Sequence, residues 1–568
     1  MRTFTHSSVT ISQPIGKSLP LRSRLQIGSA LVGAAVALTS PALAFAPDEC
    51  GAVVNGEVTC TAAGAPYANG IAYGAMATND LTINLEAAAQ VNASGADVGG
   101  ITASTFDGDL TINQAGAILL TGTNSTGILA VTDRGLLTVN SSSITSTKDG
   151  ISASNGTGDT VINAGSITTT AANANGIATT TYDGALDIHI ENISTQDHDA
   201  DGIRVSAGAG AVSITSDGTI KTRGQFSSGV NVMAGGDVVI KVADVMASNG
   251  SSHGIIAQTN GGALDISASS VRTGSNAVRA ISSGAAAGAG EITINIGSAT
   301  TFNGNSAATY ATNDFSDIDV TVGDLRTLGN DSAGVSTQNF NGQTVITTTG
   351  AVSTISAASA GINAQSVNGA IGITNDGEIS TYGQDSHGIE AHSSTGVVSV
   401  KNANQLTTDG DAARGILAYS SSGAVDVLNT GRIATYSDNA HAVVAQSVSG
   451  AVTLTNETTG PSPPQAMGPA ALSRPARPAT SWSTTTAQSP PRASPLTASA
   501  SATLKATSPW SAPARSRPRA TSPRPSGCRL CSPTSGRKSV PSRPRAATAT
   551  PSISGRSRAM RPLPPRAY

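Results

Sequence analysis

Hydrophobic and polar residues alternate over short stretches of this chain, and three such stretches fill one repeat. In a late repeat, Val425 and Val427 fall on one face of a short strand, with a polar residue between them on the other face. Ile433 marks a second short strand, and Val443 and Ala445 mark a third. Gly, Asn and Asp residues between the stretches favour turns. One repeat therefore predicts three short strands joined by turns.

The same pattern recurs with a period of about 27 residues. Segments that begin at Gly369, Gly396 and Gly423 align without gaps, each 27 residues after the last. A small residue followed by an apolar one marks one place in each repeat, at Gly100, Gly127, Gly150, Gly176, Gly202, Gly229, Gly254, Gly334, Gly361, Gly388 and Gly415, and more weakly at Ala277, Ala308 and Ala442. The period predicts an all-β fold, a right-handed parallel β-helix of about fourteen coils over residues 79–457.

Asparagine recurs at the end of the first strand of the repeat. The residues are Asn113, Asn140, Asn163, Asn375, Asn402, Asn429 and Asn456. Stacked amides can hydrogen-bond from coil to coil and can satisfy a tight, inward-facing turn. We therefore predict a structural asparagine ladder, in preference to a ligand site or a glycosylation site.

The composition changes abruptly after residue 457. Residues 1–457 hold five prolines, 16 Lys and Arg residues and all 36 acidic residues, a balance of −20. Residues 458–568 hold 21 prolines, 17 Lys and Arg residues and no acidic residue, a balance of +17. The acidic repeats argue against a nucleic-acid partner, and the Pro-, Arg-, Ser- and Ala-rich remainder predicts a disordered tail over 458–568.

The first residues predict export. Arg22 and Arg24 precede an apolar run, and a small-residue motif follows, so 1–44 is a signal peptide that is cleaved between Ala44 and Phe45. The apolar run is shorter than the ~20 residues of a membrane anchor.

Two cysteines follow the predicted cleavage site. Cys50 and Cys60 lie in the stretch 45–78, which we predict to be an N-terminal cap. In an oxidising periplasm these two residues can form a stabilising disulfide.

The densest acidic stretch holds the best candidates for catalysis. Asp197, Asp199 and Asp201 alternate with other residues, so they share one side if the stretch is a strand, but a turn fits equally well. Paired carboxylates serve glycoside hydrolysis or bind calcium. We favour a solvated turn, and predict neither catalysis nor a cofactor.

The histidines and the last cysteines give weaker signals for metal. His387 and His441 occupy equivalent places two coils apart, with Arg414 between them, so a shared zinc ion is disfavoured. Cys528 and Cys531 form a C-x-x-C pair that lacks a second pair of ligands. We predict no metal site.

The signal peptide and the acidic, Gly-, Ser-, Thr- and Asn-rich repeats with Gly-Ile anchors resemble the passenger region of an autotransporter, a Gram-negative type V secreted protein. The resemblance covers 45–457 and rests on the style of the repeats. It implies a non-enzymatic, adhesin-like rod at the outer membrane and cell surface, with a host or cell-surface receptor or a polysaccharide as partner. It also implies a C-terminal β-barrel translocator, whose ~10-residue alternating strands we do not find in 458–568.

Two other functions stay open at this point. One is a polysaccharide lyase or hydrolase, because such enzymes also use parallel β-helices. The other is a haemagglutinin-like protein secreted through a separate transporter, which would need a distinct N-terminal secretion domain.

The codons after the repeats permit the repeat to continue in another reading frame. Read two nucleotides later, the codons for Pro461–Pro469 permit "ITTAGDGA", close to "LTTDGDAA" at 406–413. We predict that the reading frame slips near Glu457–Thr459 and that 458–568 is out-of-frame translation. The product would then be truncated and confined to the periplasm. The alternative is a genuine basic tail for a nucleic acid or an anionic surface.

Overall fold

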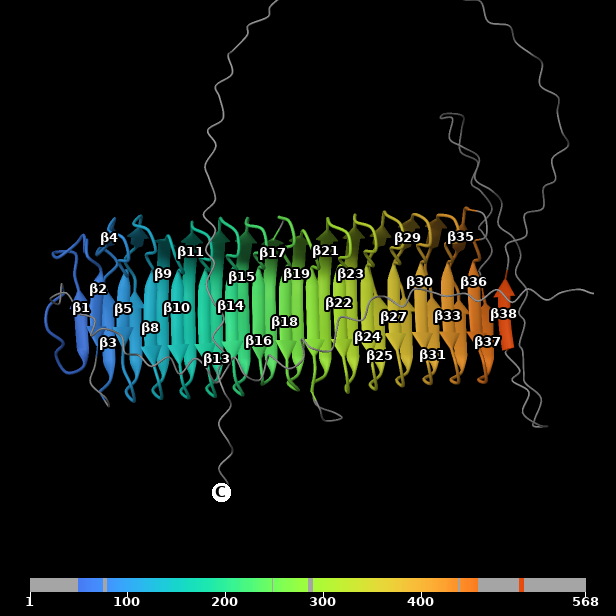
Figure 1. The fold of residues 1–568 in the computed structure, drawn as a ribbon, viewed down its shortest axis with the longest axis horizontal. Coiled ribbons are helices and arrows are strands. Elements are labelled where there is room, and N and C mark those ends of the chain that lie inside the picture. Colours follow the sequence, from blue (N-terminus) through green and yellow to red (C-terminus); the bar gives the residue numbers. More distant parts are fainter. Residues whose placement is uncertain are drawn as a thin grey trace, which may run out of the picture. The chain divides into compact units, whose positions relative to one another are not determined.

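The described residues form one parallel β-solenoid. The computed structural model describes residues 50–74, 79–247, 249–284, 290–437, 440–457 and 500–504. Over these residues the chain has strands and turns but no helix, and the coils make a right-handed solenoid of about fourteen turns (Figure 1). The fold class predicted from the repeat period is confirmed.

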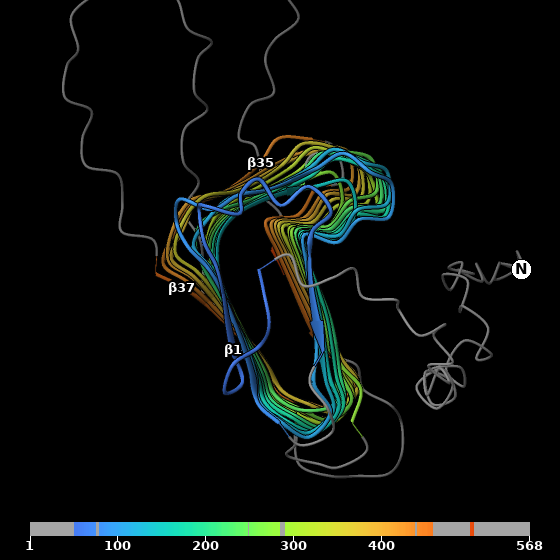
Figure 2. The same ribbon diagram turned by 90° about the vertical axis from the view of Figure 1, so that its left-hand side faces the viewer.

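The strands form two sheets. The first and second strands of the coils form a 22-stranded sheet of β1 (Glu57–Cys60), β3 (Leu81–Leu85), β4 (Val91–Ala93), β6 (Leu110–Gln114), β7 (Ile118–Leu120), β9 (Leu137–Ser146), β11 (Thr160–Thr169), β13 (Leu186–Thr195), β15 (Val212–Thr222), β17 (Val238–Ala247), β19 (Leu264–Thr273), β21 (Ile292–Thr301), β23 (Ile318–Thr327), β25 (Thr344–Thr348), β26 (Val352–Thr354), β28 (Ile371–Asn375), β29 (Ile379–Tyr382), β31 (Val398–Asn402), β32 (Leu406–Asp409), β34 (Val425–Asn429), β35 (Ile433–Thr435) and β37 (Val452–Asn456). Viewed along the solenoid axis, successive coils follow the same outline (Figure 2).

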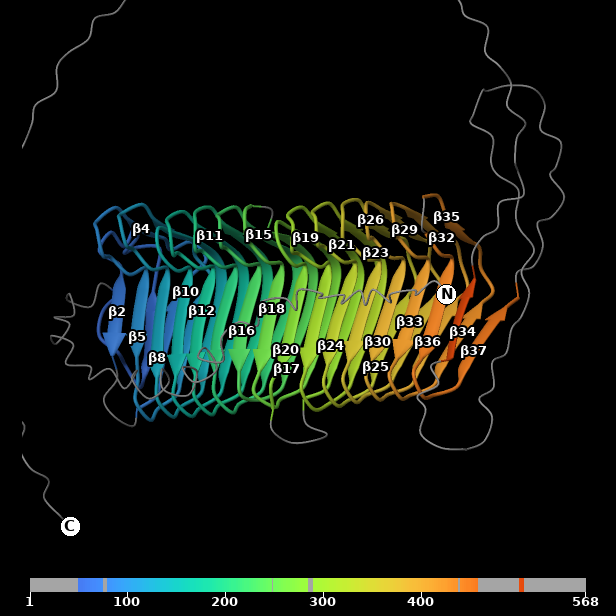
Figure 3. The same ribbon diagram turned by 45° about the vertical axis from the view of Figure 1, so that its right-hand side comes forward.

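The third strands form the other sheet, which covers one side of the solenoid (Figure 3). Its 16 strands are β2 (Ile71–Gly74), β5 (Ile101–Ser104), β8 (Ile128–Thr132), β10 (Ile151–Asn155), β12 (Ile177–Thr181), β14 (Ile203–Ala207), β16 (Val230–Ala234), β18 (Ile255–Thr259), β20 (Val278–Ser282), β22 (Thr309–Asn313), β24 (Val335–Asn339), β27 (Ile362–Ser366), β30 (Ile389–Ser393), β33 (Ile416–Ser420), β36 (Val443–Ser447) and β38 (Ala500–Leu504).

The number of strands in a coil varies along the solenoid. Three separate strands, as predicted, occur in the late coils, for example β34, β35 and β36. From β9 to β23 the first two strands merge into one bent strand of 10 or 11 residues. In the merged strands of 10 residues the alternation shifts at the bend, where neighbouring residues such as Gly165 and Ser166 are not buried. The second half of the strand then buries the other set of alternate positions, which turns the chain without ending the strand.

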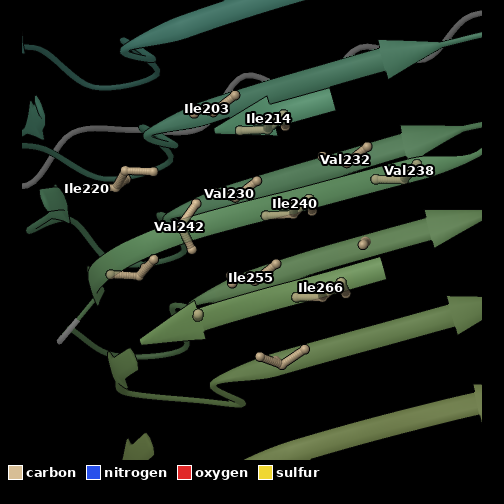
Figure 4. Packing of buried hydrophobic residues seen from close by; sticks show 14 of the residues in the cluster. Ile203, Ile214, Ile220, Val230, Val232, Val238, Ile240, Val242, Ile255 and Ile266 are labelled. Atoms are coloured by element: carbon tan, nitrogen blue, oxygen red, sulfur yellow. The ribbon is translucent and has the colours of Figure 1, made fainter. Parts of the chain in front are cut away.

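The core is a set of stacked rows of β-branched and leucine side chains. Ile214, Ile240 and Ile266 are register partners in β15, β17 and β19, and all three are fully buried (Figure 4). Ile203 and Val230 form the equivalent row in the third strands. Each such side chain contributes about 1.5–3 kcal/mol by leaving water. Small identical layers thus replace the large aromatic core that this composition cannot build.

The anchor glycines are explained by a close approach between coils. A Cβ atom added to Gly361 would lie 2.6 Å from the carbonyl oxygen of Gly388 and 2.7 Å from Cγ2 of Ile379. Both contacts are shorter than van der Waals contact, so a side chain there would push the turn away from the core. The Gly-Ile signal in the sequence therefore marks where the chain enters the third strand.

The N-terminal end of the solenoid is tied down by side chains. Cys50 and Cys60 are joined by a disulfide. The buried Tyr73 hydroxyl accepts a hydrogen bond from the Cys50 N–H (3.3 Å) and donates one to the Gly51 carbonyl (2.9 Å). The coil pattern already includes β1, which lies within residues 45–78 and pairs in parallel with β3.

Several sequence predictions fall on residues outside the described ranges. These are the signal peptide 1–44, the cleavage site between Ala44 and Phe45, and most of the predicted tail. One element within the tail is described, because β38 pairs antiparallel with β36, with Leu504 opposite Val443. The tail prediction did not anticipate this strand.

Candidate functional site

The acidic stretch forms a turn between a second and a third strand. Asp197 and Asp199 are exposed in the turn that joins β13 to β14, and Asp199 has a left-handed φ of 54°. His198 donates its backbone N–H to Asp197 Oδ1 (2.7 Å), and its Nδ1 lies 2.9 Å from Asp199 Oδ2. The hydrogen bond to Asp199 raises the pKa of the His198 imidazole. Of the two predicted alternatives, the structure has the turn.

Asp201 does not join the other two carboxylates. It is 5% exposed, and its Oδ1 and Oδ2 accept hydrogen bonds from the Ser228 N–H (2.7 Å) and Asn231 Nδ2 (3.0 Å) of the next coil. Burial raises the pKa of the Asp201 carboxyl, although these hydrogen bonds oppose the shift. The alternation that would place all three aspartates on one side is therefore absent, because Asp201 is held by the next coil.

A shallow hollow of about 390 Å³ lies beside this turn. Its lining includes Asp197 and Asp199 together with Arg223, Phe226 and Asn249. The turn itself belongs to the scaffold, because Thr195 Oγ1 donates to the Ala200 carbonyl (2.8 Å) across it. The same bond crosses the equivalent turn in other coils, from Thr169, Thr222, Thr301, Thr327, Thr354 and Thr381. The aspartates thus decorate a recurring structural turn.

Polar residues also stack immediately before the anchor glycines. The Asn175 backbone N–H donates to Asp149 Oδ1 (2.7 Å), and the Asp201 backbone N–H donates to Asn175 Oδ1 (3.0 Å). Each side chain therefore satisfies the backbone of the next coil. The sequence shows this column as the residue before each Gly-Ile pair, so the position that relates His387 to His441 also marks Asp149, Asn175 and Asp201.

The two predicted equivalent histidines belong to this column, with Arg414 between them. The Arg414 backbone N–H donates to His387 Nδ1 (3.0 Å), so that nitrogen is an acceptor. Burial, and then the charge of Arg414, lowers the pKa of His387 to about 4. His441 lies one coil beyond Arg414 and also takes part in an interaction. In the part of the chain that the structure describes, no three His, Cys, Asp or Glu side chains are grouped as metal ligands. Cys528 and Cys531 lie outside that part.

The predicted asparagine ladder is two ladders on opposite faces. Asn113 donates to Asn84 (2.8 Å), Asn140 to Asn113 (2.9 Å) and Asn163 to Asn140 (2.9 Å). These residues occupy the fourth position of their strands and face outward. The prediction of one inward-facing ladder is therefore wrong for this group, because neighbouring positions of a strand face opposite sides.

The second ladder lies inside the solenoid. Asn375, Asn402 and Asn429 occupy the fifth position of their strands and are at most 3% exposed. Each donates through Nδ2 to the Oδ1 of the next asparagine at 2.7 Å, ending at Asn456. Asn402 and Asn429 also donate to carbonyl oxygens of the turn that follows, at Asn404 and Gly431 (2.9 Å each). This group matches the prediction.

The outer ladder lines a hollow of about 530 Å³. His189 and Glu191 continue its lining beyond Asn163. The amides use one donor and one acceptor in the ladder, so each keeps a second N–H and a second lone pair. The hollow can therefore offer regularly spaced hydrogen bonds to hydroxyl groups.

Comparison with family models, with curated proteins and with solved structures gives no match. The fold and the side-chain geometry are therefore the basis for function. Within the described ranges, no helix has the length and apolarity needed to cross a bilayer.

Proposed function

We propose that residues 45–457 are the stalk of an exported, autotransporter-like passenger, a surface or adhesin-like rod without catalysis. The use of the polar residues carries this proposal. Asp149, Asp201, His387 and the inner asparagines all hold one coil to the next, and the exposed Asp197 and Asp199 lie on a recurring turn. The outer ladder supports a polysaccharide or a glycosylated receptor as partner, because its spare amide groups suit hydroxyl groups.

Export is tested in a Gram-negative host that expresses the full chain. We expect a mature N-terminus at Phe45 in the periplasmic fraction, with Cys50 and Cys60 resistant to alkylation until a reductant is added. Leu31→Arg, which breaks the apolar run, should keep the precursor in the cytoplasm. A full-length cytoplasmic protein with free thiols would contradict the proposal.

The change of chemistry after Glu457 adds a second part to the proposal. A chain whose reading frame slips there is expected to reach the periplasm without surface display. Protease added to intact cells should leave it whole, whereas permeabilised cells should lose it. Digestion in intact cells would show that the protein reaches the surface by itself.

An enzymatic function is supported only by the hollow beside Asp199. It predicts release of uronates or oligosaccharides from acidic polysaccharides, and loss of that release in Asp199→Ala. Asp183→Ala is the matched control, because Asp183 lies on a different turn of the same coil. We expect no release from the unaltered protein; release that only Asp199→Ala abolishes would overturn the non-enzymatic proposal.

A further inference from the structure

Two strand edges at the C-terminal end of the solenoid have no further strand paired with them in the part of the chain that the structure describes. Among the described residues, β35 pairs only with β32, and β37 pairs only with β34. Ile433 in β35 is half-buried, whereas its register equivalents Leu406 and Ile379 are fully buried. An edge with free N–H and C=O groups is a template for another strand. The last coil thus resembles an interior coil whose neighbour has been removed.

The inner asparagine ladder ends on an unpaired donor. Asn429 donates to Asn456, but the Nδ2 atom of Asn456 is buried and has no hydrogen-bond partner among the described residues. A buried donor without an acceptor is costly, and such groups are uncommon in native structures. In every preceding step, the acceptor is the side chain at the same position of the next coil. Asn456 therefore lacks an acceptor from a following coil.

The edge of the third-strand sheet is covered differently. Every described strand pair from β2 to β36 in that sheet is parallel, but β36 pairs antiparallel with β38. β38 comes from the segment that begins after the change of composition. A further parallel coil would take the place of β38 on β36.

The shifted phase permits such a coil. Its apolar codon, across Pro461 and Ser462, corresponds to Leu406, which precedes Gly415 by 9 residues, Gly423 by 17 and Asn429 by 23. Two later shifted codons have the form NGC, which permits glycine. One lies 9 codons further on, across Ala470 and Ala471, and the other lies 17 codons further on, across Pro478 and Ala479. The shifted codon 23 further on, across Thr484 and Thr485, has the form NAC, which permits Asn or Asp.

We propose that the end formed by β34, β35 and β37 is an interface for one more coil of this solenoid, encoded in the shifted phase. That coil presents an Asn or Asp oxygen to Asn456 Nδ2 and pairs in parallel with β35 and β37. The codons permit Asn or Asp at the position that would face Asn456 Nδ2 in the next coil. The codon pattern and the hydrogen-bond pattern are independent observations, and they point to the same position. The inference rests on the change of phase in the proposed function, but not on export or on a surface role.

Two purified proteins test this interface by hydrogen exchange of backbone amides. One is the full chain as it exists, and the other is a chain in which the phase is restored after Glu457 from the genomic DNA. In the existing chain, Asn456→Leu removes the oxygen that accepts from Asn429, so it should lower protection in β34 and β37 by the value of that one bond. Asn429→Leu is the matched control, because it removes bonds that both chains have, and it should lower protection in β31 and β34 at least tenfold in each chain.

In the restored chain, protection in β35 and β37 should rise at least tenfold. The loss caused by Asn456→Leu should be at least fivefold larger there than in the existing chain, because the bond from Asn456 Nδ2 is lost as well. The interface is contradicted if Asn456→Leu lowers protection by the same factor in both chains, since Asn456 Nδ2 would then have gained no partner. It is also contradicted if protection in β35 and β37 does not rise in the restored chain. Both outcomes are independent of export, so a cytoplasmic location would refute the proposed function while leaving this test intact.

Discussion

The two asparagine ladders differ in environment although they share residue type and geometry. The outer ladder in the early coils joins Asn84, Asn113, Asn140 and Asn163 at 2.8–2.9 Å, with side chains that water can reach. The inner ladder in the late coils, from Asn375 to Asn456, has bonds of 2.7 Å and starts with nearly inaccessible side chains. Water can replace a lost bond in the first region but not in the second. The position within the strand, not the residue, decides what an asparagine contributes.

The largest effect is expected from Asn402→Ala in the inner ladder. The change removes the acceptor of Asn375 and the donor to Asn429 and to the Asn404 carbonyl. Buried groups left unpaired cost ~1–3 kcal/mol each, so the free energy of unfolding of the late coils should fall by about 3 kcal/mol. Urea titration with hydrogen exchange resolved by coil measures this loss. A loss below ~1 kcal/mol would mean that water enters the late coils.

Acidification should distinguish the two regions next. In the late coils the pKa of His387 is lowered from 6.5 to about 4, mainly by burial. The folded state therefore binds fewer protons than the unfolded state. The contribution of His387 to stability is constant above pH ~6.5 and falls as the pH drops toward 4, by about 3 kcal/mol. Protection in β30 and β33 should decrease over this interval. His387→Gln should remove most of that dependence.

The early coils should respond with the opposite sign. Burial raises the pKa of Asp149, against hydrogen bonds from Asn175. The folded state then binds protons more readily than the unfolded state, so acidification through that pKa favours folding around β10 and β12. Protection that falls equally in early and late coils between pH 7 and pH 4 would contradict this difference.

The smallest effect is expected from Asn140→Ala in the outer ladder. The change removes two hydrogen bonds from a half-buried side chain whose partners can turn to water. We expect a loss of roughly 0.5–1 kcal/mol, in line with the net contribution of such bonds. The same urea titration applies. A loss as large as that of Asn402→Ala would erase the comparison between the ladders.

The strands and the coil period could be predicted because both are local. Val425 and Val427 alternate with polar residues, and the structure places them in β34 as expected. The split of the ladders was also present in the sequence, since Asn113 lies three residues after Leu110, whereas Asn375 lies four after Ile371. An odd separation from the first buried residue places the asparagine on the outer face of the strand, and an even separation places it on the inner face.

Other features depend on neighbouring coils and are not visible in one repeat. The fate of Asp201 is set by Ser228 and Asn231, which lie 27 and 30 residues further on. The alternation of aspartates at 197–201 therefore did not reveal that Asp197 and Asp199 lie in an exposed turn whereas Asp201 is buried and hydrogen-bonded.

The most direct test of the account is the nucleotide sequence of the genomic DNA across codons 455–490. A coil that continues in the shifted phase needs a small anchor residue, since a Cβ atom at the equivalent Gly388 would lie 2.6 Å from the Gly415 carbonyl oxygen. The anchors of the repeats are Gly or Ala, and the codon form NGC permits only Gly of these two. The third base of the Ala470 codon should therefore be G, and that of the Thr484 codon should be A or G. Pyrimidines at both places would give Cys or Arg and Tyr or His instead, and would contradict the continuation.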